Sequence, residues 1–413
     1  MRVDWDKTNI ESVCKLFTDG NWIETKDQSP EGIRLIQTGN VGNGQFKNRK
    51  EKARYIDQRT FDRLKCHEIF EGDCLISRLP DPVGRACLIP STDERMITAV
   101  DCSILRFDKE KIEPLYFSYY SQSMEYQKDV ETYCTGATRK RISRKNLNKI
   151  IIPLPPLPEQ KRIVDILDES FSSIDEAIAN TEKNLANARE IFESYLNDVF
   201  AKKGENWNEC ILSEICDVRD GTHDSPKYVD EGIPFVTQKN IRKHGLCLKK
   251  TKYISEKDHN IFIKRSNVSF GDILISMIGV NRGMACLVDD NRNFSIKNVG
   301  LVKSSGNLHM PFLLYYLKSD IARKYVDEES RGGAQPFIGL GKLRAFPILS
   351  APIEEQISVT EVLDRLSNDS NSLIENYQKK LNSLNELKQS LLAKAFSGEL
   401  TASSDDVLKE VVG

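Results

Sequence analysis

The sequence of 413 residues lacks any apolar run close to the roughly 18–20 residues that a membrane-spanning helix needs. Its first residues, 1–7, contain no apolar signal region, so we expect a cytoplasmic protein. The ten cysteines form no C-x-x-C pair and there are only five histidines, so we expect reduced thiols and no metal site. The composition, 39% hydrophobic and 29% charged, is that of a globular protein, and the length predicts two or three domains.

Signatures of catalysis are also missing. Phe337–Gly341 fits the F-x-G-x-G loop of adenine methyltransferases, but no N-P-P or D-P-P motif accompanies it. The pair Gly341-Lys342 is not a P-loop, because proline stands where the first glycine should be and leucine follows the lysine. Pro80-Asp81 suggests a nuclease, but the acid-x-Lys motif that should follow is missing. We therefore predict no catalytic residue in this chain.

The net charge of −2 argues, for the chain as a whole, against a nucleic-acid binder. The charge alternates along the sequence, however. It is +3 over residues 1–152, −4 over 153–203, +4 over 204–349 and −5 over 350–413. The two basic stretches are suited to meeting phosphates, whereas the two acidic segments would face something else.

An internal repeat explains this alternation. Four pairs of segments match in the same order, with offsets that drift from 200 to 196: 33–41 with 233–241, 72–77 with 271–276, 84–88 with 283–287, and 156–160 with 352–356. A period near 200 is too long for a solenoid, so it indicates a duplicated unit. We predict lobe 1 at residues 1–152, a segment at 153–203, lobe 2 at 204–349, a second segment at 350–400 and a tail at 401–413.

Both segments are predicted to be long helices. Apolar or small residues recur at steps of three and four from Ile163 to Val199. In the second segment, leucines and Tyr377 recur at steps of three, four and seven from Leu363 to Leu391. The proline-rich run at 153–158 precedes the first helix and Gly204 is a natural stop. Each helix of about 40 residues would be about 60 Å long and would need a partner for its apolar stripe.

The natural partner of each helix is the other one, in an antiparallel pair. The alternative is two independent domains, each with its own C-terminal helix.

The lobes have mixed character, because short β-rich runs alternate with helical stretches at 114–130 and 310–329. Strand-like runs lie at 33–37, 73–77, 85–89, 97–106 and 150–152, and in the repeat at 233–237, 272–278, 284–288, 299–303 and 346–349. The fold class is therefore α+β, with two mixed α/β lobes, two long antiparallel helices forming a coiled coil, and a pseudo-twofold tandem repeat.

Polar and basic loops in both lobes are candidates for contact with nucleic acid. Arginine forks can bind phosphate or guanine, and glutamine can pair with adenine. The candidates are Thr38, Asn40, Arg78, Arg85, Thr138, Arg139, Lys140 and Arg141 in lobe 1, and Gln238, Asn240, Arg282, Arg331 and Gln335 in lobe 2. Basic clusters at 47–54 and 249–252 are candidates for phosphate contact. Each of these side chains taken alone is also consistent with a solvated surface charge.

Several motifs resemble those of type I restriction–modification specificity subunits. The junction at 153–168 is similar to the first conserved helical region of that family, and 391–400 to the end of the second. Residues 220–226, 233–241 and 271–276 resemble parts of its target recognition domains. Lobe 1 departs from the pattern, because Asp19-Gly-Asn-Trp22 replaces Asp220-Gly-Thr-His223. The resemblance covers essentially the whole chain.

The resemblance implies a subunit without catalytic activity whose lobes each read one half of a bipartite, asymmetric sequence in double-stranded DNA. The helices would space the half-sites and dock two methyltransferase subunits. S-adenosylmethionine would belong to those subunits, and ATP and magnesium to a motor–nuclease (restriction) subunit. The alternatives are a specificity subunit of a type IIB-like enzyme, a DNA-modifying enzyme, and a coiled-coil scaffold.

Overall fold

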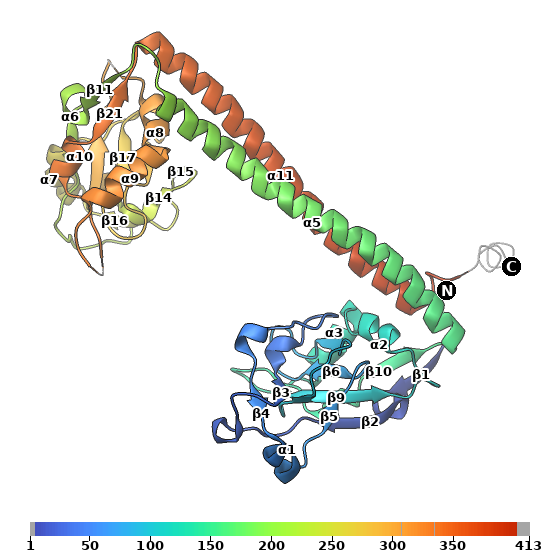
Figure 1. Cartoon of the computed structure of the whole chain (residues 1–413). Coiled ribbons are helices and arrows are strands. Elements are labelled where there is room, and N and C mark those ends of the chain that lie inside the picture. Colours follow the sequence, from blue (N-terminus) through green and yellow to red (C-terminus); the bar gives the residue numbers. More distant parts are fainter. Residues whose placement is uncertain (1–4, 307, 334, 403–413) are drawn as a thin grey trace. The chain divides into compact units, whose positions relative to one another are not determined.

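The structure, a computed structural model, describes residues 5–306, 308–333 and 335–402 (Figure 1). Most of the predicted tail, 403–413, lies outside the described residues. The chain forms two compact units. Unit 1 contains the chain up to Thr181 and the stretch from Lys379, and unit 2 is Glu182–Gln378. Each unit thus consists of one lobe together with part of each long helix.

Lobe 1 is built from short strands and short helices. The strands are β1 (Asp6–Asn9), β2 (Cys14–Asp19), β3 (Ile33–Ile36), β4 (Tyr55–Ile56), β5 (Glu68–Ile69), β6 (Cys74–Ser77), β7 (Ala86–Leu88), β8 (Met96–Thr98), β9 (Cys102–Phe107) and β10 (Ile151–Leu154). The helices are α1 (Gln58–Leu64), α2 (Pro114–Tyr120), α3 (Met124–Tyr133) and α4 (Arg144–Leu147). One antiparallel sheet has the order β2-β9-β6-β7, and a second has the order β4-β3-β8-β5 with β3 parallel to β8. A third, two-stranded sheet pairs β1 with β10.

Lobe 2 repeats this arrangement. Its strands are β11 (Asn208–Ile211), β12 (Val218–Asp220), β13 (Ile233–Val236), β14 (Ile241–Arg242), β15 (Gly245–Leu246), β16 (Lys252–Ile254), β17 (Ile273–Ser276), β18 (Ala285–Leu287), β19 (Ser295–Ile296), β20 (Val299–Val302) and β21 (Pro347–Ser350). Its helices are α6 (Leu212–Ile215), α7 (Glu256–Ser266), α8 (Met310–Lys318), α9 (Asp320–Glu329) and α10 (Leu340–Arg344). The sheet β12-β20-β17-β18 has the same order as β2-β9-β6-β7, and β13 lies parallel to β19 as β3 does to β8. The predicted internal repeat is therefore confirmed by the topology.

One predicted strand and two predicted helices are each divided into two elements in the structure. The run at 97–106 is two strands, because the chain turns between Thr98 and Cys102. The predicted helix at 114–130 is α2 followed by α3, and Ser123 accepts a hydrogen bond from the Tyr126 amide to begin α3. Ser319 divides the predicted helix at 310–329 in the same way. A serine side chain that can satisfy free amides favours a new helix start.

The long helices α5 (Leu157–Lys202) and α11 (Ile353–Ser397) run side by side (Figure 1). In unit 1, Lys388 of α11 pairs with Asp175 of α5, and in unit 2 Ser370 binds the backbone of Ala188. Residue numbers rise along α5 as they fall along α11, so the pair is antiparallel, as predicted. The alternative of two independent domains is wrong, because each helix contributes to both units.

Each lobe packs on the start of one long helix and the end of the other. In lobe 1, Tyr116 and Tyr120 lie 5.3 and 5.2 Å from the ring of Phe396, near the end of α11. In lobe 2, Phe312 and Tyr316 lie 5.4 and 5.3 Å from Phe200, near the end of α5. These rings belong to the main hydrophobic cores, so each lobe is fixed to the helices by buried aromatic packing.

A buried glutamine attaches the first turn of each long helix to its own lobe. The Gln160 carbonyl accepts a hydrogen bond of 2.8 Å from the Glu113 amide, and its amide donates one of 2.8 Å to the Pro155 carbonyl. Gln356 makes the equivalent bonds, accepting from the His309 amide at 2.8 Å and donating to the Ala351 carbonyl at 2.7 Å. Both side chains are fully buried. The matched junctions 156–160 and 352–356 thus have a structural explanation.

Candidate nucleic-acid interface

One loop is closed by the same backbone hydrogen bonds in both lobes, and we call it the closing loop. It spans Thr135–Arg141 in lobe 1 and Arg331–Phe337 in lobe 2. The amides and carbonyls of its two end residues bond to each other at 2.8 Å in both directions in lobe 1, and at 2.9 and 2.8 Å in lobe 2. Gly136 and Gly332 have φ values of 101° and 99°, a region that favours glycine. The predicted correspondence of these loops therefore extends to their hydrogen bonds.

The closing loops present the predicted polar side chains to solvent. Thr138, Arg139, Lys140 and Arg141 are exposed in lobe 1, as are Arg331 and Gln335 in lobe 2. Residue 334 is not among those described. Within the described parts of the chain, no ion pair or side-chain hydrogen bond holds the side chains of Arg139, Arg141 or Gln335. These groups are thus available for an external ligand.

A second element, the hairpin turn, lies against each closing loop. It spans Arg78–Gly84 between β6 and β7, and Met277–Gly283 between β17 and β18. The Ile142 amide donates to the Arg78 carbonyl at 3.1 Å, and the Ile338 amide donates to the Met277 carbonyl at 2.9 Å. The loop and the turn therefore form one surface in each lobe.

Arg85 is a buried residue that holds this surface together. Its guanidinium donates to the carbonyls of Leu79, Pro80 and Pro82 at 2.8–3.0 Å, and to those of Thr38 and Val41 at 2.8 and 2.7 Å. Burial lowers the pKa of Arg85. All these contacts are internal, so the structure gives Arg85 a positioning role rather than a direct contact with nucleic acid.

Arg78 is also buried and paired inside lobe 1. Its Nη1 lies 2.6 Å from Oδ2 of Asp19. In lobe 2 the equivalent acid, Asp220, pairs instead with Arg265 at 2.6 Å and with His223 at 3.1 Å. In the motif Asp220–His223 the buried acid therefore forms an ion pair within lobe 2, and Arg78 of lobe 1 replaces the cation that Arg265 supplies.

Asn40 and Asn240 have equivalent internal roles in a short 3₁₀ helix after β3 and β13. Each side-chain carbonyl accepts from a preceding amide, that of Gln37 at 3.0 Å or Thr237 at 2.9 Å. Each side-chain amide donates to a following carbonyl, that of Lys47 or residue 247. Both asparagines are buried, so the structure favours a positioning role for them as well.

The other predicted residues are less enclosed. Thr38 and Gln238 are half-buried beside these asparagines, and Oε1 of Gln238 is a buried acceptor without a partner among the described residues. Arg282 is half-buried in the hairpin turn of lobe 2, where it pairs with Asp327 at 2.5 Å and donates to Ser330 at 2.8 Å. The structure thus brings Arg282 to the closing loop but engages its guanidinium.

The basic clusters lie on exposed loops next to these elements. Arg49 in the cluster at 47–54 is exposed. Its Nη1 lies so close to Gly39 that a Cβ atom added to this glycine would be only 2.9 Å away, so Arg49 covers the 3₁₀ helix of lobe 1. Lys252 lies 4.2 Å from the ring centroid of Tyr228 in lobe 2. Both cations are exposed, as the predicted contact with phosphate requires.

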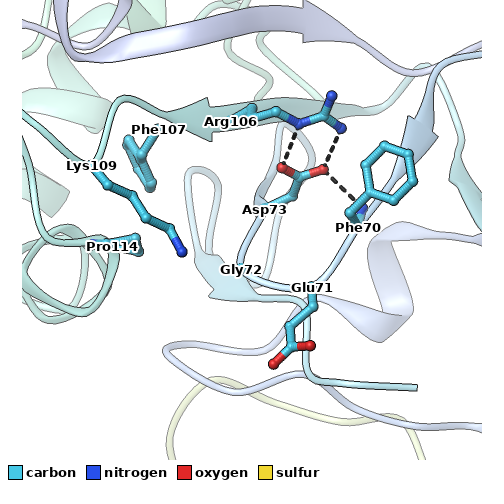
Figure 2. Close-up of a pocket in the computed structure, with 8 residues that line it drawn as sticks. All are labelled: Phe70, Glu71, Gly72, Asp73, Arg106, Phe107, Lys109 and Pro114. Atoms are coloured by element: carbon cyan, nitrogen blue, oxygen red, sulfur yellow. Dashed lines mark hydrogen bonds and ion pairs between the residues drawn. The ribbon is translucent and has the colours of Figure 1, made fainter. Parts of the chain in front are cut away.

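Two pockets in equivalent places are less suitable as sites. The pocket of lobe 1 has a volume of about 330 Å³, and Figure 2 shows the Asp73 carboxylate on its wall, bonded to the Arg106 guanidinium and to Phe70. Asp73 is buried and accepts from Arg106 at 2.9 and 2.8 Å and from the Phe70 amide at 2.9 Å. The hydrogen bonds that Arg106 donates to Asp73 raise the pKa of Arg106. In lobe 2, Asp272 similarly binds Lys303 at 2.6 Å, so the repeated Gly-Asp motif stabilises the sheet.

Sequence reasoning missed two residues at the centre of the hairpin turns. Asp81 in lobe 1 is exposed, and Val280 in lobe 2 is 92% exposed. They are equivalent because both turns lie between matched serine and glycine residues at an offset of 199. The equal length of the two turns in the sequence could have identified Asp81 and Val280 as equivalent residues. Phe337, at the end of the closing loop, is another exposed apolar residue.

None of the helices in the ranges given above is long and apolar enough to cross a membrane. In those same ranges, no group of three or more His, Cys, Asp or Glu side chains is arranged to hold a metal ion. All ten cysteines are free thiols.

Comparisons with known proteins match this architecture. The EcoBI specificity subunit of a type I restriction enzyme from Escherichia coli is 26% identical over 312 residues, which are 69% of this chain and 65% of that subunit, just under two thirds of its length. The putative MjaX specificity subunit of Methanocaldococcus jannaschii is 22% identical over 432 residues, covering 96% of this chain and 94% of that one.

Solved structures share the fold. A chain from a study of complex assembly and conformational transition in the type I restriction–modification system has a TM-score of 0.78 at 19% identity, covering 96% of this chain and 98% of its own. The HsdS subunit of Thermoanaerobacter tengcongensis has a TM-score of 0.60 at 19% identity, covering 96% and 97%. The family model described as the type I restriction modification DNA specificity domain matches residues 2–187 and 204–383. Because that model matches both repeats and most of the sequence, the chain belongs to the type I restriction–modification DNA specificity family.

Proposed function

We propose that this chain is the DNA-specificity subunit of a type I restriction–modification complex, in which each lobe reads one half of a bipartite, asymmetric double-stranded site. The observation that carries the proposal is the surface of closing loop and hairpin turn, which occurs twice, with the same closing hydrogen bonds and turns of equal length but with different exposed side chains. A repeated frame that carries different polar groups suits the recognition of two different sequences. The relatives found are type I subunits, which favours this function over a type IIB-like one.

We propose that the two long helices set the distance between the half-sites and dock two methyltransferase subunits. The segment 153–203 carries a net charge of −4 and the segment 350–400 a net charge of −3, which are unsuited to contact with DNA and suited to a protein surface. Restriction subunits would join the same assembly. The complex would work in the cytoplasm, where the ten cysteines remain reduced.

We propose that the chemistry of the complex resides in the partner subunits. S-adenosylmethionine would be held by the methyltransferase subunits, and ATP and magnesium by the restriction subunits. The contribution of this chain is then the choice of sequence, made through Arg139 and its neighbours in lobe 1 and through Gln335 in lobe 2. Contacts to base edges would supply the discrimination, and the surrounding lysines would supply salt-dependent affinity.

A lobe exchange tests the proposal. Residues 204–349 are replaced by the corresponding lobe of another family member, and the modified sites are mapped by sequencing after methylation by the assembled complex. We expect one half of the recognised sequence to change and the other half to stay. A change in both halves, or in neither, would contradict the assignment of one lobe to one half-site.

Two further measurements address the alternatives. The purified chain alone, given labelled S-adenosylmethionine and DNA, should transfer no label, and transfer would indicate a DNA-modifying enzyme. With the methyltransferase partner, binding to duplex DNA should weaken as salt rises. A complex that forms but has no affinity for DNA would indicate a coiled-coil scaffold.

A further inference from the structure

We propose that the two lobes read different base pairs with equivalent residues: lobe 1 a G·C pair through Arg139 and Asp81, and lobe 2 an A·T pair through Gln335 and Val280. This inference rests on the proposed function, because it assumes that each lobe reads one half-site. It adds the chemical class of the base pair that each half-site contains.

The equivalence of these residues follows from the hydrogen bonds of the closing loops and from the equal length of the hairpin turns. Arg139 and Gln335 occupy the same position in closing loops whose end residues form the same pair of hydrogen bonds. Asp81 and Val280 occupy the same position in hairpin turns of equal length. The residue that directly follows each closing loop, Ile142 or Ile338, is hydrogen-bonded to the first residue of the hairpin turn, at 3.1 Å in lobe 1 and 2.9 Å in lobe 2. Each lobe therefore carries the two positions on neighbouring, connected segments.

In lobe 1 the two positions have complementary charges. The guanidinium of Arg139 can donate two hydrogen bonds to O6 and N7 of guanine, and the carboxylate of Asp81 can accept one from N4 of cytosine. Both side chains are exposed. A surface that bound only phosphates would gain nothing from a carboxylate at this position, because phosphate would repel it. The presence of Asp81 near the basic closing loop therefore favours a base edge, and not a phosphate, as the group that Asp81 contacts.

In lobe 2 both positions are uncharged. The amide of Gln335 can make two hydrogen bonds to N6 and N7 of adenine, and an apolar side chain can contact the C5-methyl group of thymine. Val280 is 92% exposed and Phe337 is 47% exposed. The two segments are joined a second time, because the Gly279 amide donates to the Pro336 carbonyl at 2.8 Å. Apolar groups contribute nothing to phosphate binding, so their place beside Gln335 favours thymine.

The experiment removes one methyl group from the DNA. The complex with the methyltransferase partner is titrated with duplexes of the recognised sequence, in which single thymines are replaced by uracil. The lobes are first assigned to their half-sites by the lobe exchange described above. We expect uracil at one thymine in the half-site of lobe 2 to weaken binding about four-fold, as expected when one methyl group leaves an apolar contact. Uracil in the half-site of lobe 1 should have no such effect.

Protein variants identify the side chain involved. Val280→Ser should abolish the difference between thymine and uracil, whereas Ile261→Ser, at a 54% exposed position on α7, should preserve it. In lobe 1, the double variant Arg139→Gln, Asp81→Val should shift the preference at one position from G·C toward A·T.

The outcomes separate this inference from the proposed function. If no bipartite site is found, the proposed function fails. If a bipartite site is found but uracil has no effect in the half-site of lobe 2, or the half-site of lobe 1 contains no G·C pair, only the present inference is overturned. An equal effect of uracil with wild-type Val280 and with Val280→Ser would also overturn it.

Discussion

Ser370 in α11 donates a hydrogen bond of 2.6 Å from its Oγ to the backbone carbonyl of Ala188 in α5. The serine is 9% exposed, so the bond lies within the helix pair of unit 2. It is a polar link between the two helices, as the Lys388–Asp175 pair is in unit 1, and it fixes their register at this level.

Replacing this serine tests the link. Ser370→Ala should lower the free energy of unfolding by about 1 kcal/mol relative to Ser372→Ala, because only the first substitution removes an interhelical hydrogen bond. Ser372 is exposed on the same helix, so its variant controls for the higher helix propensity of alanine. Denaturant unfolding of the two variants measures the difference. Equal stabilities would show that the bond contributes nothing.

Removing the exposed polar groups of the closing loops should affect the two half-sites separately. Arg139→Ala should weaken binding to DNA with the correct half-site of lobe 1 by about 1–3 kcal/mol, and Gln335→Ala should do so for lobe 2. Affinities for the specific site and for random DNA are compared at one salt concentration. An equal loss on both kinds of DNA would instead indicate a phosphate contact.

Lengthening both helices should lengthen the unread spacer in the DNA. Four residues inserted after Ala186 in α5 and four after Leu373 in α11 add about 6 Å and about 400° of rotation, so the apolar stripe is only modestly displaced. The half-sites should stay the same while the spacer gains one or two base pairs, as read from the methylated sites.

A one-residue insertion in each helix is the matched control. It turns the stripe by about 100° and should damage folding or partner docking. An unchanged spacer with full activity in the four-residue variant would show that the helices do not set the distance.

The stability of lobe 2 should depend on pH through His259. Burial lowers the pKa of this imidazole from 6.5, against a smaller opposite effect of Glu256, and its Nδ1 lies 2.8 Å from Oγ of Ser295. The unfolded chain therefore binds the proton at a higher pH than the folded chain does. The stabilisation is present above pH 6.5 and is lost as the pH falls through the folded pKa.

His259→Gln removes the titrating group and keeps a polar side chain. The variant should lose less thermal stability than the wild type between pH 7.5 and pH 5, while the two remain similar at pH 8. Thermal unfolding across this range is the measurement. The same pH dependence in both proteins would mean that other groups are responsible.

The sequence predicted the repeat and the helices because both depend on spacing. The offset of about 199 survives in β6 and β17, and the steps of three and four residues survive in α5 and α11. The division of 114–130 and 310–329 into two helices each was missed, because the sequence does not show whether a single serine in a helical pattern will cap a new helix with its hydroxyl.

The candidate site was predicted less well, because residue type does not show in which direction a polar side chain lies. Arg85 and Arg139 are both arginines in loops, yet Arg85 is buried against five carbonyls and Arg139 is exposed. Asp81 and Val280 were passed over because neither is a typical DNA-binding residue. Only their equivalent places in the structure relate them to Arg139 and Gln335.

The division of each long helix between two units has a consequence for synthesis on the ribosome. Unit 2 is complete once Gln378 has been made, but the core of unit 1 also needs Phe396, which packs on Tyr116 and Tyr120. Lobe 1 is therefore translated first and finished last. The aromatic residues Tyr116 and Tyr120 lack their partner Phe396 while the whole of unit 2 is synthesised. The nascent chain is therefore most exposed to aggregation and to capture by chaperones during this part of translation.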